Sequence, residues 1–150
     1  ACYLWRRYQR AKFDRLLKEK VREIYPVIFQ ANSSQQTRNL PPSSVILLSS
    51  YQENGKMHST RTELHFEDRS LQSKCYWHVS GKGDDDDGSF RILDGLLAQD
   101  GTAYWVEEQG KLRVLNFGTF DWRRMSFGGQ WRAENGKRAT YSAVEVVEQE

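Results

Sequence analysis

Four consecutive carboxylates, Asp84 to Asp87, stand directly before Gly88. Hard cations such as Ca²⁺ bind several converging oxygen atoms. An EF-hand loop does not fit, because placing Gly88 at its sixth position puts Gly83 at the first, where an Asp is required. Consecutive side chains also point in different directions, so Asp85 and Asp87 are only weak metal candidates. Three interpretations stay open: a structural turn, a weak Ca²⁺ site, and a docking site for a basic partner, which could be the basic arm of this chain.

The three histidines, His58, His65 and His78, are the other candidate metal ligands. A zinc site needs three or four convergent ligands. We expect only His65 and His78 to lie on neighbouring strands, with Cys75 close in sequence. No C-x-x-C or H-x-x-x-H spacing is present. Solvated histidines on strands are therefore the expectation, and no metal or other cofactor is predicted.

No catalytic residue is predicted. The chain lacks a G-x-S-x-G elbow, an H-E-x-x-H pair, a P-loop and the dinucleotide-binding glycine pattern. Two carboxylates inside a barrel could do acid–base chemistry if burial raised one pKa. The candidates for such a pair are Glu63, Glu67, Asp94 and Glu107. The sequence does not show which of them points inward, so an enzyme remains an alternative.

These residues must be positioned by strands, because short aromatic and β-branched runs alternate with glycine-bearing turns from residue 45 onward. The pattern predicts about eight antiparallel strands, at 45–51, 62–67, 76–80, 89–93, 103–108, 112–117, 125–131 and 139–146. Short hairpin turns make consecutive strands neighbours, and closing such a meander removes its exposed edges. The predicted fold is mainly β: an up-and-down antiparallel β-barrel with an N-terminal amphipathic helix. A two-sheet sandwich is the alternative.

Large rings are expected inside this barrel. An eight-stranded barrel is either filled by side chains or just wide enough for one small ligand. The tentative ligand-binding residues of the interior are Trp77, Phe90, Trp105, Trp131 and Tyr141. A packed aromatic core and a pocket for a small apolar ligand both remain open.

The N-terminal segment predicts a helix over residues 3–24, with Phe13, Leu16, Leu17, Val21 and Ile24 on one face. Pro26 is expected to end it, since the residue before a proline disfavours the α conformation. The predicted organisation is a basic helix (1–25), a polar linker (26–44), the barrel (45–146) and a tail (147–150).

Charge is unevenly distributed along a chain with a net charge of only +2. Residues 1–23 carry eight basic and three acidic side chains, and the remainder is mildly acidic. The residues expected at a membrane surface are Trp5, Arg6, Arg7, Arg10 and Lys12, since aromatic and basic residues collect at the cytoplasmic edge of transmembrane spans. The acidic body argues against nucleic acid as a partner.

Two locations follow from this segment. In the first, a span upstream of Ala1 tethers the protein to the cytoplasmic face of a membrane, and Cys2 is a candidate palmitoylation site. In the second, the helix docks on the barrel of a soluble cytoplasmic protein. The two cysteines, Cys2 and Cys75, predict no disulfide framework and indicate a reducing compartment.

The blocks WHVSGKGDDDDGSFRILDG, GTAYWVEE, FGTFD and FGGQWRAENG resemble calycin-like barrels such as avidins and lipocalins. They look closer to an uncharacterised barrel domain of microbial eukaryotes, with the pattern G-x-G-x-D-x-x-G-x-F followed later by G-x-W. Gly81, Gly83, Asp85, Gly88 and Phe90 match the first part, and Gly129 and Trp131 match the last. The resemblance covers about residues 45–146 and implies a fold without an agreed activity. The polar ring of an avidin-type biotin site does not map onto this chain.

The expected function is a non-enzymatic barrel module that binds a protein partner or a small apolar ligand, held at an anionic membrane surface through residues 1–23.

Overall fold

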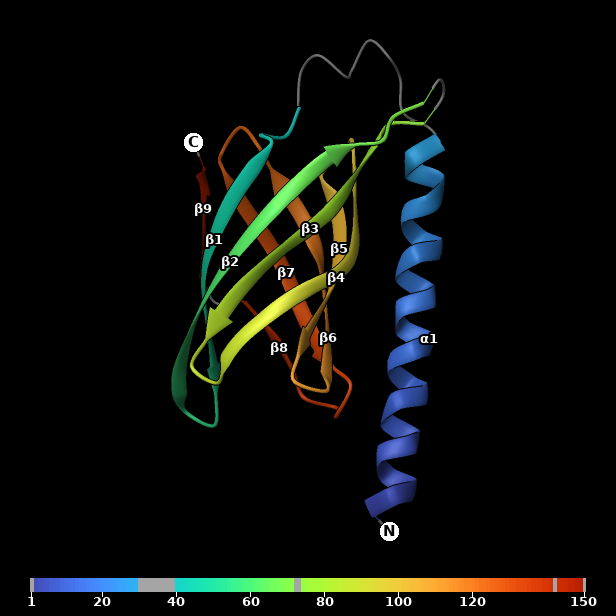
Figure 1. Cartoon of the computed structure of the whole chain (residues 1–150), viewed down its shortest axis with the longest axis vertical. Coiled ribbons are helices and arrows are strands. Elements are labelled where there is room, and N and C mark those ends of the chain that lie inside the picture. Colours follow the sequence, from blue (N-terminus) through green and yellow to red (C-terminus); the bar gives the residue numbers. More distant parts are fainter. Residues whose placement is uncertain (1, 30–39, 72–73, 142, 150) are drawn as a thin grey trace.

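A computed structural model describes residues 2–29, 40–71, 74–141 and 143–149. Within these residues the chain forms one helix and nine strands (Figure 1). The helix is α1 (Cys2–Phe29), and the strands are β1 (Ser44–Glu53), β2 (Lys56–Asp68), β3 (Tyr76–Asp85), β4 (Gly88–Ala98), β5 (Thr102–Gln109), β6 (Leu112–Asp121), β7 (Ser126–Ala133), β8 (Arg138–Thr140) and β9 (Ala143–Glu148). The mainly β prediction with an N-terminal helix is confirmed.

All nine strands belong to one antiparallel sheet with the order β8-β7-β6-β5-β4-β3-β2-β1-β9. The predicted strand 139–146 is wrong as a single element, because its first part pairs with β7 and its last part pairs with β1. Thr140 and Ala143 are three residues apart, so they can be separated by no more than about 11 Å. The two edges of the sheet therefore approach each other, and the sheet curls into a half-barrel rather than a two-sheet sandwich (Figure 1).

Tight turns join the strands into hairpins. Asn54 and Gly55 both have positive φ, at 54° and 76°, as a two-residue turn between twisted strands requires. The acidic turn is shorter than predicted: Asp84 and Asp85 end β3, Gly88 begins β4, and only Asp86 and Asp87 form the turn.

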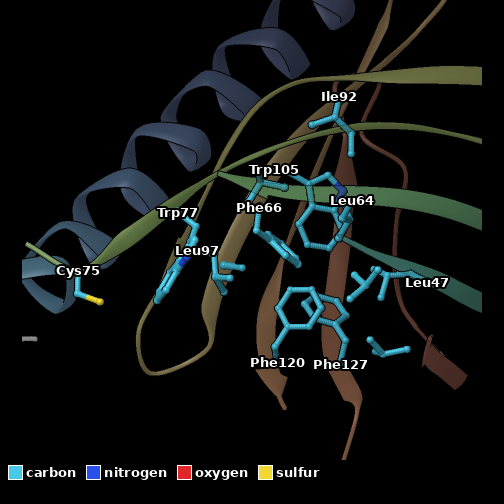
Figure 2. Close-up of a cluster of buried hydrophobic side chains, with 14 residues drawn as sticks. Leu47, Leu64, Phe66, Cys75, Trp77, Ile92, Leu97, Trp105, Phe120 and Phe127 are labelled. Carbon is cyan, nitrogen blue, oxygen red and sulfur yellow. The ribbon is translucent and has the colours of Figure 1, made fainter. Parts of the chain in front are cut away.

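Alternate side chains on the strands point to the concave side of the sheet and form the main core. Figure 2 shows this cluster, in which Phe66, Trp105, Phe120 and Phe127 meet from four different strands. Phe120 stacks on Trp122 with ring centroids 4.5 Å apart. Offset and edge-on ring pairs of this kind add to the stabilisation from burial alone.

A second core joins α1 to the convex side of β4, β5 and β6. Phe13, Ile24 and Ile28 are buried there against Tyr104 and Leu115. The predicted apolar helix face is thus confirmed. The predicted helix end is wrong, since α1 continues through Pro26 to Phe29. Pro26 is exposed and cannot donate to the Arg22 carbonyl, and the helix continues for three residues beyond it, with Ile24 and Ile28 buried on either side of it.

Candidate functional site

The apolar end of the barrel interior is filled by side chains. Of the predicted interior residues, Trp77 and Trp105 belong to the main core, and Tyr141 packs against it. Trp105 contacts Phe127 at a ring-centroid distance of 5.3 Å. These rings occupy the space in which an apolar ligand of a carrier would lie.

Phe90 and Trp131 are also buried, and the motif glycines explain how Phe90 fits. Gly83 lies opposite Phe90 in the β3–β4 register, and a Cβ at Gly83 would meet the Phe90 ring at 2.4 Å. In the G-x-G-x-D-x-x-G-x-F pattern, the second glycine is therefore needed to make room for the ring of the phenylalanine.

The opposite end of the interior, beside the hairpin turns, is polar. Glu107 is buried, and its Oε1 accepts a hydrogen bond from Trp105 Nε1 at 3.2 Å. Asn116 is fully buried, and its Oδ1 accepts a hydrogen bond from the Tyr141 hydroxyl. Burial raises the pKa of Glu107 to about 8; the hydrogen bond from Trp105 opposes this shift, and the Asp85 charge adds to it. The Glu107 carboxyl is therefore mostly protonated at neutral pH.

Two buried donors at this end lack an acceptor among the described residues: Asn116 Nδ2 and Trp131 Nε1. The Asn116 amide lies near enough to Glu107 to lower its pKa slightly, but Nδ2 does not reach normal hydrogen-bond geometry. Tyr51 crosses the interior from β1 and meets Trp131 edge-on at 5.2 Å. Side chains thus span the interior at this level too.

The four candidate carboxylates do not gather inside. Glu107 is buried, whereas Glu67 and Asp94 are exposed. Glu63 pairs with Arg61 at 2.8 Å, and that hydrogen bond lowers the pKa of the Glu63 carboxyl. Glu107 consequently has none of the other three candidates as an inward partner.

Hydrogen bonds within the protein use the carboxylates of the acidic turn. Asp85 Oδ1 accepts from the Asp87 backbone N–H at 2.8 Å and from Gln109 Nε2 at 2.9 Å. Asp86 Oδ2 lies 3.0 Å from His58 Nδ1. Within the described residues, no group of three His, Cys, Asp or Glu side chains could hold a metal ion.

The remaining histidines lie on the convex face with separate partners. His65 Nδ1 lies 3.1 Å from Ser44 Oγ, and His78 Nε2 lies 3.2 Å from Asp94 Oδ1. Cys75 is buried and Cys2 is exposed, both as free thiols. The geometry brings none of these groups together as a site.

The predicted membrane-surface residues lie at the N-terminal end of α1, which extends beyond the hairpin turns of the sheet (Figure 1). Tyr3, Leu4, Trp5 and Tyr8 are between 52% and 73% exposed. Arg6, Arg7, Arg10 and Lys12 are exposed between and beyond them. We call residues 3–10 the exposed end of α1.

The helix is anchored to the barrel just beyond this end. Arg113 of β6 lies over the Phe13 ring at 4.8 Å and donates to Asp14 Oδ1 at 2.8 Å. The same guanidinium donates to Glu134 Oε2 at 2.8 Å. These contacts, together with the buried Phe13 and Ile24, hold α1 against the barrel; of residues 3–10 only Gln9 is buried, and none belongs to the apolar core.

Sequence reasoning missed Asn116, Arg113 and Gln9. Asn116 occupies an inward position on a strand, where an apolar residue is the usual expectation. Arg113 and buried Gln9 act through contacts between α1 and the barrel, which no local pattern encodes. The alternation of side chains along β6 puts Asn116 on the same face as Phe120, and this was the one signal that could have indicated the burial of Asn116.

No protein-family model, curated protein or solved structure matches this chain. In the part of the chain that the structure describes, no helix combines the length and the apolar character needed to cross a bilayer.

Proposed function

We propose that this chain is a non-enzymatic binding module that holds its half-barrel at an anionic membrane surface through the exposed end of α1. The observation that carries the proposal is the combination of four large exposed apolar side chains with Arg6, Arg7 and Arg10 in under three helical turns. Tyr and Trp favour the membrane–water interface, where the ring is buried and the polar atom stays wet.

The positive charge of the exposed end of α1 favours an anionic membrane leaflet as its binding partner. Each Lys or Arg near a cytoplasmic leaflet contributes about 1 kcal/mol of attraction. The exposed end carries no acidic residue between Cys2 and Phe13. The rest of the helix is covered by the barrel along the face of Phe13, Ile24 and Ile28. The exposed end holds four of the five large apolar side chains that are exposed on the described part of α1, and Tyr25 near the other end is the fifth.

The filled interior supports a binding role for the outer surface over a carrier role for the barrel. Trp105, Phe120 and Phe127 contact one another at the apolar end, and Tyr51 meets Trp131 at the polar end.

The test is co-sedimentation of the whole chain with vesicles of phosphatidylcholine alone or with added phosphatidylserine. We expect binding only to the anionic vesicles, falling steeply as salt screens the charges. Arg6→Gln with Arg7→Gln should weaken binding tenfold or more, since about 2 kcal/mol of attraction is lost.

The matched control is Lys18→Gln with Arg22→Gln, which makes the same charge change on the same helix away from residues 3–10. This control should retain most of the affinity. Binding that is absent, insensitive to salt, or equally weakened by both pairs of substitutions would overturn the proposal.

A further inference from the structure

A basic groove of about 420 Å³ lies between the N-terminal half of α1 and the β7–β8 turn. On the helix side it is lined by Trp5, Gln9 and Lys12. On the barrel side it is lined by Arg132, Lys137 and Arg138. Its volume is within the range of small-ligand pockets.

Most of the positive charge of this groove has no acidic partner. None of its lining residues is acidic. Among the described residues, Lys12 and Arg138 have no ion pair, and Arg132 donates only to the neutral Gln130 Oε1 at 3.2 Å. Lys137 alone has a carboxylate partner, Glu53, at 3.4 Å. Burial, and then the neighbouring Arg138 charge, lower the pKa of the Arg132 guanidinium. An anion bound between these like charges would reduce their mutual repulsion.

The walls of the groove are fixed in place before any ligand arrives. Gly136 has a positive φ of 94°, and a Cβ there would lie 2.8 Å from Gln9 Oε1, so the turn and the helix approach closely. The Arg113 bonds to Asp14 and Glu134 also hold these two elements together. Because these two elements are already in place, binding need order only the cationic side chains and not the backbone between them.

We propose that this groove binds a phosphomonoester group, carried by the headgroup of a phosphorylated membrane lipid. A phosphomonoester has a charge of about −1.5 to −2 at pH 7 and three strong acceptor oxygens, which suits two guanidinium groups and an ammonium better than the single diester charge of an ordinary phospholipid. Trp5 lines the groove and is 59% exposed, so the groove opens beside the end of α1 proposed to meet the bilayer. The lipid source rests on the proposed function, because the groove must face the membrane.

The test compares vesicles containing phosphatidylinositol 4-phosphate with vesicles containing phosphatidylserine, matched in surface charge. For the unaltered chain we expect about tenfold tighter binding to the phosphoinositide vesicles. Arg132→Gln with Arg138→Gln should reduce the ratio of the two affinities to near one. Arg138→Gln alone should lower this ratio in part. Because Arg138 is exposed, the single variant should fold even if the double variant does not, and it then tests the groove by itself.

The matched control is Arg123→Gln with Arg124→Gln, which removes two exposed arginines from the β6–β7 turn at the other end of β7. The affinity ratio should survive in this control. Equal affinity of the unaltered chain for the two kinds of vesicle, or an unchanged ratio in the Arg132 and Arg138 variant, would overturn the groove proposal while leaving the proposed function intact.

Calorimetry with soluble inositol 1,4-bisphosphate separates the two sources of the phosphate. Failure to bind either kind of vesicle would contradict the proposed function. If the chain binds neither kind of vesicle but binds the soluble compound, and Arg132→Gln with Arg138→Gln abolishes that binding, the groove takes a soluble phosphomonoester and the lipid source is wrong.

Discussion

Aromatic side chains are concentrated in two regions of this protein, the barrel interior and the exposed end of α1, and they differ in what surrounds them. Inside the barrel, Phe120 has four ring neighbours, Phe66, Trp105, Trp122 and Phe127. At the exposed end of α1, the ring centroids of Trp5 and Tyr8 lie 6.0 Å apart, and both side chains are more than half exposed. The same residue type therefore stabilises the fold in one region and remains available for binding in the other.

The largest expected effect is on the interior side of this comparison. Phe120→Ala should lower the free energy of unfolding by about 3–5 kcal/mol, because it removes a ring and leaves a cavity among its four neighbours. Urea denaturation measures the loss, and Phe120→Leu should show a smaller one. A loss below about 1 kcal/mol for the alanine variant would mean that the interior is loosely packed.

A second effect should distinguish the polar end of the interior from the apolar end. The pKa of Glu107 is raised by burial from its ordinary 4.5 to about 8. Between these values the folded chain holds a proton that the unfolded chain releases, so the free energy of unfolding should fall as pH rises, by about 1.4 kcal/mol per pH unit from this group.

The measurement is urea denaturation at several pH values between 5 and 8, with Glu107→Gln as the comparison. The variant keeps the shape of the side chain and does not titrate, so its profile should be flatter. Asp85 and Tyr141 face this position in both proteins. Parallel profiles would show that Glu107 is ionised in the folded state.

A third prediction concerns stability at the exposed end of α1. Trp5→Ala with Tyr8→Ala should change the free energy of unfolding by no more than about 0.5 kcal/mol, since exposed side chains contribute little to folding. The same variant should bind anionic vesicles more weakly than the unaltered chain. A large loss of stability would place these rings in the fold rather than at a binding surface.

The smallest effect is expected at the acidic turn. Millimolar Ca²⁺ or a chelator should leave the Tm unchanged, because Asp85 and Asp86 already serve hydrogen bonds of the protein. Differential scanning calorimetry checks this, with Mg²⁺ as the ionic-strength control. A rise in Tm specific to Ca²⁺ would restore the turn as a metal site.

The sequence predicted what depends on local pattern. Turn residues such as Asn54 and Gly55 and the alternation of β2 indicated the hairpins, and the spacing of Phe13 and Ile24 indicated the buried face of α1. It could not predict that residues 138–148 divide between β7 and β1, because both pairings satisfy the same alternation.

The candidate sites were less predictable than the fold. The proposed membrane surface was visible because it is contiguous in sequence from Tyr3 to Lys12. The basic groove was not, since Lys12 and Arg138 meet only when α1 lies on the barrel. Glu107 was one of four candidate carboxylates, and only the register of β5 shows that it points inward.

The pairing of β9 with β1 has a consequence for the order in which the protein matures. Val45 and Glu148 lie directly opposite each other on adjacent strands, although nearly the whole barrel sequence lies between them. During synthesis the earlier hairpins can form in turn, but β1 keeps an unpaired edge until the last residues of β9 leave the ribosome. Contacts of such long sequence separation slow folding, and an unpaired edge invites association with other nascent chains. The nascent chain is therefore most vulnerable to aggregation while β1 has been made and β9 has not, and assistance from chaperones would be most effective in that interval.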